Sequence, residues 1–327
     1  MPKFLMRCLP VGHMLSGFVL AASVSAAVAA DYPDKPIRIV VPFPAGVSTD
    51  IVARTMADAI AVRLGQSVIV DNKAGADGVI GVMDVARAKP DGYTLLIATN
   101  GPLSAAQHLK KSPPYDVLRD LTPISDIGRA TFAVYVSPRT PAKTLPEFIA
   151  YAKAHPGKLN YASGNLTGQL AFAQIAKTAG LDMTHVPYKG ETNAMNDMFG
   201  GHADAIIATL GTGLPMVKAG KLRILAVLGQ DRNPEIPEVP TLTEAGVPAM
   251  PIQSWFGMMG PARMPTAVVQ KVNRAVTDSL NDPAVIKRMH MISVEPRTST
   301  PDAAAQVLRT QLEAHGKAIR DANLPLN

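Results

Sequence analysis

Hydrophobic and polar positions divide this chain into short apolar runs and amphipathic stretches, beginning with residues 37–65. Residues 37–41 are mostly β-branched and lie between two prolines, which predicts a buried strand. Residues 42–50 predict a loop, because prolines lack the backbone donor that a strand requires. An amphipathic helix is predicted next, with Gly65 as its C-terminal cap. Its apolar residues recur at every fourth position: Val52, Met56, Ile60 and Leu64.

The loop over 42–50 has the chemistry of a candidate anion site. Ser48, Thr49 and Asp50 can each cap the helix that follows. The start of a helix directs free N–H groups and the positive end of the helix dipole at one spot, which favours a negative charge. An ordinary strand–helix connection with a proline-rich loop explains the same residues equally well.

The same alternation continues to residue 98 and predicts a βαβαβ unit. Strands are predicted over 67–70 and 93–98, with a helix over 79–87 between them. Strands that alternate with helices indicate a parallel sheet, whose loops at the carboxyl ends of the strands line a crevice. Residues 99–104, which include Asn100, form a polar, glycine-containing loop of the kind that binds ligands.

The second half places polar loops after its predicted strands in the same way. Thr144 and Glu147 have the spacing of a capping box at a helix start. Residues 163–168 are rich in glycine and hydroxyl groups and precede another helix. Residues 187–192 and 209–213 are predicted as further loops.

Two long extended stretches, 124–136 and 255–259, have no helices of their own and predict crossings between two lobes. Such crossings can act as hinges. Helices over 265–281 and 301–322 are predicted to complete the chain. We therefore predict an α/β fold of two lobes, each a mostly parallel sheet flanked by helices, with two crossing strands. The predicted lobes comprise residues 31–128 with 253–327, and residues 129–252.

The first thirty residues have the order of regions found in a secretory signal peptide. Lys3 and Arg7 precede an apolar, alanine-rich stretch over 9–28, and small residues follow at the predicted cleavage point near Ala30. A retained membrane anchor is the alternative, but the stretch is weakly hydrophobic and no basic residues follow it. We expect residues 1–30 to be removed on export to the periplasm.

Composition excludes several classes of protein. The single cysteine, Cys8, lies in the predicted signal peptide, so the mature chain has no thiol for disulfides, catalysis or metal binding. Loss of the signal peptide leaves 30 basic residues against 26 acidic ones, a mild net charge of about +4. Only 5% of the residues are aromatic, which leaves few stacking platforms for nucleic acid. We expect no nucleic-acid partner.

No catalytic or cofactor motif appears in the chain. The hydrolase elbow, the phosphate-binding loop, the zinc helix and the dinucleotide spacing are all absent from the sequence. His185 is predicted to pack or to bond a loop. An isomerase or lyase with Asp50, Lys189 or Asp204 as its base is the rival hypothesis. We expect a binding protein with no catalytic residue, metal or cofactor.

Seven segments of the chain carry the motifs of a known family: residues 32–38, 41–54, 65–66, 71–78, 90–95, 185–190 and 240–246. On these segments the chain resembles the tripartite tricarboxylate transporter substrate-receptor family, also called Bug proteins, which have the type II periplasmic-binding-protein fold. The resemblance implies capture of a small carboxylate between the lobes of a monomer and delivery to the permease subunits of the transporter in the membrane. Presentation of the ligand to a membrane sensor is an alternative.

The resemblance also implies a set of ligand-binding positions. In proteins of this family, the ligand carboxylate is held by backbone groups of the loops, by hydroxyls and by ordered waters. No arginine occurs in the corresponding loops of this chain. The first lobe is expected to contribute Phe43, Gly46, Val47, Ser48, Thr49, Asp50 and Asn100. The second lobe is expected to contribute Ser163, Asn165, Thr167, Tyr188, Lys189 and Asp204.

Three positions depart from the family pattern. Val47 and Leu166 stand where the family usually has glycine, and Gln169 replaces a histidine. Bulky apolar side chains at the first two positions remove volume from the site and add apolar surface. We therefore expect a mono- or dicarboxylic ligand with a less polar body, aromatic acids included, rather than a tricarboxylate such as citrate.

Overall fold

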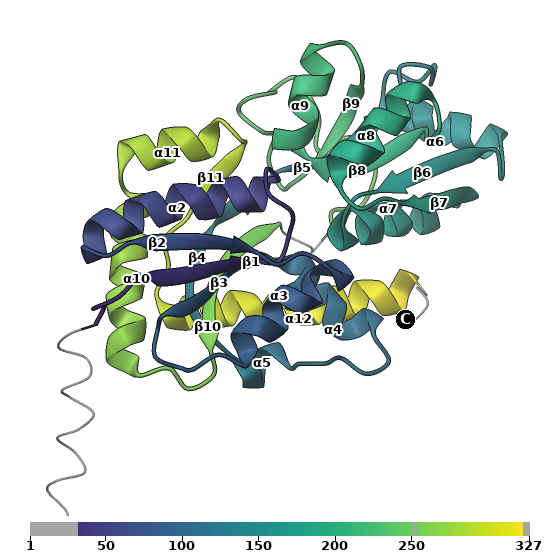
Figure 1. The fold of residues 1–327 in the computed structure, drawn as a ribbon. Helices are drawn as coiled ribbons and strands as arrows, with labels where there is room; N and C mark the ends of the chain where they lie inside the picture. The colour runs from purple at the N-terminus through teal and green to yellow at the C-terminus, as the bar shows by residue number, and fades with distance from the viewer. Residues whose placement is uncertain (1–31, 251–253, 323–327) are drawn as a thin grey trace, which may run out of the picture.

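The computed structural model describes residues 32–250 and 254–322, so the predicted signal peptide lies outside the described residues. Strands and helices form two lobes, each built on one sheet and flanked by helices (Figure 1). The first lobe contains a six-stranded sheet in the order β11-β4-β10-β3-β1-β2. Its strands are β1 (Ile37–Val41), β2 (Val68–Asn72), β3 (Thr94–Thr99), β4 (Leu121–Ala130), β10 (Trp255–Pro261) and β11 (Val294–Pro296).

The second lobe contains a five-stranded sheet in the order β7-β6-β8-β5-β9. Its strands are β5 (Phe132–Val136), β6 (Leu159–Ser163), β7 (Met183–Pro187), β8 (Ala205–Thr209) and β9 (Arg223–Leu228). The predicted parallel pairs are present, because β1 pairs in parallel with β2 and β3, and β6 with β7 and β8. Strands β4, β5 and β10 pair antiparallel with their neighbours, so each sheet is mixed.

Helices cover both faces of each sheet. In the first lobe they are α2 (Ser48–Leu64), α3 (Val79–Ala86), α4 (Ala106–Leu109), α5 (Val117–Asp120), α10 (Thr266–Leu280), α11 (Pro283–His290) and α12 (Pro301–Ala322). In the second lobe they are α6 (Leu145–Ala154), α7 (Leu166–Ala179), α8 (Glu191–Gly200) and α9 (Leu210–Lys218). Short turns of other helix types occur at η1 (Ala76–Gly78) and η2 (Gly101–Ala105).

Helix α2 forms as its apolar spacing predicts. Val52, Met56 and Ile60 are buried against β1, β3 and α10 in one core of the first lobe. Gly65 ends the helix in the left-handed conformation, with φ of +68°, and its N–H donates to the carbonyl of Ala61. The predicted start of the chain's first α/β unit is therefore confirmed.

Several elements differ from the prediction, and the loops predicted over 163–168 and 187–192 include the first residues of α7 and α8. Residues 209–213 are mostly the first turn of α9 rather than a loop, because Leu210 and Leu214 are buried on the sheet. Helix α11 and strand β11 lie between the two predicted C-terminal helices. Residues 101–105 wind into the buried turn η2, where a polar ligand loop was expected.

The first predicted crossing is confirmed. Strand β4 belongs to the first sheet and β5 to the second, with Thr131 between them. Strand β10 returns the chain to the centre of the first sheet, between β3 and β4. The segment that enters β10, residues 251–253, lies outside the described residues.

Helix α12 joins the two lobes along their lower side in Figure 1. Its buried Leu308 belongs to a core of the first lobe. Further along the helix, Ala318 and Ile319 pack with Leu170 of α7 in the second lobe. The Lys177 ammonium also donates to the carbonyl of Asp321 near the end of α12. Among residues 32–250 and 254–322, no helix has both the length and the apolar character needed to cross a membrane.

Candidate ligand-binding loops

The first candidate site is the start of α2, which has no side-chain cap. Val47 occupies the N-cap position, and its apolar side chain cannot accept hydrogen bonds from the N–H groups of the first turn. Within the described part of the chain, the N–H groups of Ser48 and Thr49 have no hydrogen-bond partner. Gly46 precedes them with φ of +84°, a conformation that favours glycine. The N–H groups of Ser48 and Thr49 can therefore donate hydrogen bonds to an anion that does not belong to the helix.

Asp50 was predicted as a helix cap, and the structure places it differently. Its carboxylate lies inside the first turn and is nearly buried. It accepts from the N–H of Gly46 at 2.8 Å, from Nε of Arg54 at 3.0 Å and from Nδ2 of Asn72 at 2.9 Å. Burial would raise the pKa of Asp50, but these hydrogen bonds outweigh it and lower the pKa. The carboxylate therefore fixes the shape of the loop.

The second candidate site is the start of α7, which is capped from within. Asn165 accepts from the N–H of Gly168 at 2.7 Å through its side-chain oxygen. The side-chain nitrogen of Asn165 donates to the Glu191 carboxylate at 2.5 Å. The hydroxyl of Ser163 is 2.7 Å from Nε2 of His185, whose pKa burial lowers. The polar groups of Ser163 and Asn165 are therefore occupied by other protein groups.

Glu191 connects the loops of the second lobe. It is the first residue of α8, and it also accepts from the N–H of Thr209 at 3.1 Å and from the Thr209 hydroxyl at 2.5 Å. The hydroxyls of Thr209 and Thr212 are 2.8 Å apart. Burial raises the pKa of Glu191, although its hydrogen bonds oppose that effect. No cation lies within ion-pair distance of Glu191 among the described residues.

Close backbone packing holds the α7 and α8 loops together. A side-chain carbon added to Gly164 would lie only 2.2 Å from the backbone nitrogen of Glu191, so this position accepts glycine alone. The N–H of Tyr188 also donates to the carbonyl of Ser163 at 2.8 Å. The two loops are thereby fixed relative to each other.

The loops of the two lobes meet at the junction between the lobes. A carbon added to Gly78 would lie 3.1 Å from Pro102 and 3.3 Å from Pro42, so three loops of the first lobe converge. Leu166 packs against the first lobe's core and lies next to Gly101. The start of α7 therefore lies where the lobes touch, beside first-lobe loops that converge with the loop before α2.

Other predicted ligand residues occupy varied positions. Phe43 is partly buried against the core beside α2, and Thr167 is buried in the first turn of α7. Tyr188 is partly buried, and Lys189 is exposed on the loop before α8. Each of these residues follows the carboxyl end of a strand, as expected: Phe43 follows β1, Thr167 follows β6, and Tyr188 and Lys189 follow β7.

Asp204 lies away from these loops, whereas Asn100 adjoins Gly101 at the end of β3 but has its side chain bonded to β10 and α12. Asp204 precedes β8 at its amino end, opposite the loops, and accepts from the N–H of Asn160 at 2.7 Å. Asn100 is buried, and its side-chain oxygen accepts from the N–H of Trp255 at 2.9 Å. Its side-chain nitrogen donates to Gln311 at 3.2 Å. Asp204 therefore joins two strands, and Asn100 anchors β10 and α12.

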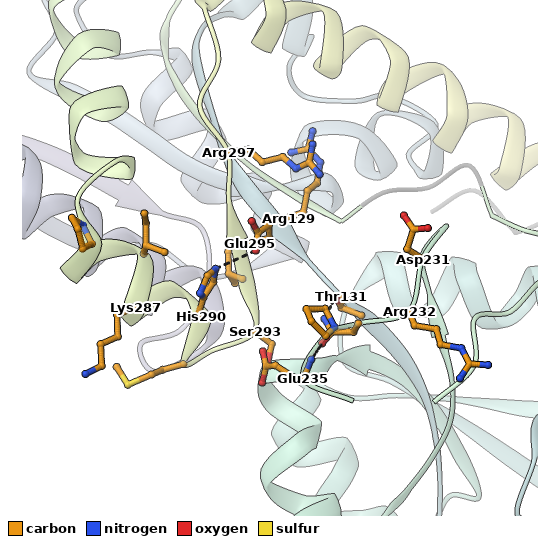
Figure 2. Close-up of a pocket in the computed structure, with 16 residues that line it drawn as sticks. Arg129, Thr131, Asp231, Arg232, Glu235, Lys287, His290, Ser293, Glu295 and Arg297 are labelled. Carbon is orange, nitrogen blue, oxygen red and sulfur yellow. Dashed lines mark hydrogen bonds and ion pairs between the residues drawn. The ribbon is translucent and has the colours of Figure 1, made fainter. Parts of the chain in front are cut away.

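A separate groove lies at the crossing between the lobes (Figure 2). Arg129 and Arg297 line it from the first lobe, and Asp231 and Arg232 line it from the second. Arg129 is already paired with Asp126 and Arg232 with Glu244. None of the predicted ligand residues lines this groove, and its mixed charges do not favour one class of ligand.

Sequence reasoning missed Glu191, Arg54, Asn72 and Thr209 as residues that shape the loops. A glutamate directly after a glycine at a helix start was the available signal for Glu191. The partners of Asp50 gave no signal, because Asn72 is 22 residues away along the chain. Among residues 32–250 and 254–322, no three histidine, aspartate or glutamate side chains form a group that could hold a metal ion.

Comparisons with known proteins agree with this arrangement. The model of the tripartite tricarboxylate transporter family receptor matches residues 52–324. BugT of Bordetella pertussis is 35% identical over 315 residues, covering 94% of this chain and 96% of BugT. The structure of R. palustris Rpa4515 with adipate has a TM-score of 0.86 at 31% identity, covering 90% of this chain and 99% of that one. The periplasmic binding protein BugD has a TM-score of 0.83 at 30% identity, with the same coverage.

Proposed function

Because this chain belongs to the tripartite tricarboxylate transporter receptor family, whose members are periplasmic solute-binding proteins and not enzymes, we propose that it captures a small carboxylate and delivers it to a membrane permease. The proposed ligand is a mono- or dicarboxylic acid, aromatic acids included. Adipate in the related Rpa4515 supports the carboxylate class. The proposed receptor is a monomer, exported with cleavage near Ala30.

The uncapped start of α2 is the observation that carries this proposal. The N–H groups of Ser48 and Thr49 have no partner in the described structure, and a ligand carboxylate would supply the missing acceptors. Arg54 pairs with Asp50, so the protein's own carboxylate adds little net repulsion there. A ligand anion at this position would be stabilised by the positive end of the helix dipole.

The remaining predicted residues receive roles that follow from their contacts. We propose that Phe43, Gly46 and Val47 shape the carboxylate loop. Thr167, Tyr188 and Lys189 would contact the ligand body from the second lobe, while Ser163 and Asn165 would maintain their loop. The lobes are proposed to comprise residues 31–128 with 253–327, and 129–252.

A thermal-shift screen with small carboxylic acids tests the binding step. An acid at a hundred times its dissociation constant should stabilise the protein by about 2.7 kcal/mol. The matching amide of each acid is the control, because it keeps the shape and lacks the charge. Mass spectrometry should recover the acid chemically unchanged. The absence of any shift across the acids, or a shift of equal size with the amides, would contradict the proposal.

Uptake by living cells tests the delivery step. A strain that lacks this chain should lose most of its uptake of the bound, labelled acid, and expression of the chain should restore it. Uptake that is unchanged by the loss would separate binding from transport.

A further inference from the structure

A carboxylate of the protein already occupies the place in the second lobe where three helices begin. Glu191 is the first residue of α8, Asn165 caps α7, and Thr209 is the N-cap residue of α9. The Glu191 carboxylate accepts from the side chain of Asn165 and from both the N–H and the hydroxyl of Thr209, at 2.5–3.1 Å. An anion is the group that such a convergence of helix starts stabilises.

No basic side chain balances the charge of this carboxylate in the described structure. All of its described hydrogen-bond donors are neutral, and no lysine or arginine reaches it in the described structure. The corresponding carboxylate of the first lobe, Asp50, is paired with Arg54 at 3.0 Å. Repulsion between like charges is stronger near a partly buried site than in water, because the effective dielectric constant is lower.

The side-chain donors around Glu191 are also occupied. The side-chain nitrogen of Asn165 and the hydroxyl of Thr209 both donate to Glu191, and the side-chain oxygen of Asn165 caps α7. A second ligand carboxylate placed beside Glu191 would therefore meet a negative charge without gaining these donors.

We propose that Glu191 determines specificity by admitting acids with one carboxylate and rejecting a second carboxylate at the second lobe. This inference rests on the proposed function, because it assumes that the ligand's first carboxylate lies at the start of α2. It selects the monocarboxylic acids from the wider class proposed above. The far end of the preferred ligand is apolar or carries a hydrogen-bond donor.

Binding of matched pairs of acids tests the proposal. Hexanoate and adipate have the same chain with one or two carboxylates, and benzoate and terephthalate form the aromatic pair. Isothermal titration of the full mature protein should give a dissociation constant at least tenfold lower for a monoacid than for its diacid. Glu191→Gln should reduce that ratio to threefold or less by strengthening the diacid. Glu238→Gln, at an exposed glutamate of the same lobe, should leave the ratio unchanged.

The possible outcomes are distinct. Equal or tighter binding of the diacid by the unmodified protein overturns the role of Glu191 and leaves the proposed function intact, as does an unchanged ratio in a folded Glu191→Gln variant. Should that variant fail to fold, the monomethyl ester of adipate provides the second test on the unmodified protein: it keeps the length of adipate and removes the second charge, so it should bind at least tenfold more tightly than adipate, and equal binding overturns the proposal. Failure of every acid to bind refutes the proposed function, and the proposal for Glu191 with it.

Discussion

Asp50 and Glu191 each lie in the first turn of a helix that follows a loop, but their surroundings differ. Asp50 is paired with Arg54 and also bonds the N–H of Gly46, so its pKa is lowered although it is nearly buried. Glu191 is surrounded by neutral donors, and burial raises its pKa. The start of α2 beside Asp50 remains uncapped, whereas the start of α7 beside Glu191 is capped by Asn165.

This difference shows that a strand, loop and helix of the same kind can have opposite affinities for an anion. The backbone supplies the same N–H groups in both lobes. The deciding factors are whether a protein side chain already accepts from them and whether its charge is balanced. Under the proposed function, the first lobe would hold the ligand carboxylate, and the second would limit the rest of the ligand.

Among the changes that test the difference between the two lobes, loss of Asp50 should have the largest effect on stability. Asp50→Ala removes three hydrogen bonds and leaves the N–H of Gly46 without its acceptor, while the side-chain nitrogen of Asn72 keeps only its bond to the carbonyl of Phe43. We expect a loss of about 3 kcal/mol in the free energy of unfolding, measured by urea denaturation, because hydrogen bonds to charged groups are the stronger ones. Carboxylate binding should weaken as well, because the loop loses its shape.

Asp58→Ala is the matched control, since Asp58 lies on the same helix and is exposed in its pair with Arg288. It should cost less than about 0.5 kcal/mol. Equal losses in the two variants would show that the buried contacts of Asp50 do not stabilise the loop.

Loss of Asn165 should have an intermediate effect. Asn165→Ala removes the cap of α7 and one donor to Glu191, and we expect a loss of about 1 kcal/mol in the free energy of unfolding. Asn165→Ser should recover part of that loss, because serine can cap the helix although it is too short to reach Glu191. Identical stabilities for the alanine variant and the unmodified protein would contradict the assigned cap.

A change of pH should have the smallest effect, with opposite signs in the two lobes. The folded pKa of Glu191 is above its unfolded value of about 4.5, so its contribution to stability is complete below that pH and is lost as pH rises through the folded pKa. The folded pKa of Asp50 is below its unfolded value, so its contribution is present above the unfolded pKa and is lost as pH falls.

Stability curves against pH measure these signs. The stability of the unmodified protein relative to Glu191→Gln should fall as pH rises above about 4.5. Its stability relative to Asp50→Asn should fall instead as pH drops below about 4. The same sign in both comparisons would remove the proposed difference between the lobes.

Local periodicity predicted most of the fold because each element carries its own pattern. The apolar spacing in α2, the capping residue Thr144 and the glycine at position 65 are each signals confined to a few neighbouring residues. Helix α11 was missed because it has only 8 residues and begins directly after α10 ends. The second lobe's α9 was missed because glycines at 211 and 213 are typical of loops.

The site was harder to predict because its residues interact across long stretches of sequence. The positions of Ser48, Thr49 and Asn165 at helix starts follow from local signals. The hydrogen bond from the side chain of Asn165 to Glu191, 26 residues later, depends on how β6, β8 and their helices pack together. Asp204 was placed with the site because a polar residue beside a strand gives no indication of which end of the sheet it occupies.

Strand β10 gives the order in which the chain can be assembled. It is the strand that joins β1, β2 and β3 to β4 and β11 within the first sheet. All strands of the second sheet lie between residues 132 and 228, so that sheet has every strand it needs before β10 has been made. During synthesis from the N-terminus, β1, β2 and β3 therefore stay separated from β4 in the first sheet until β10, in the last quarter of the chain, has been made. The lobe that begins first is finished last.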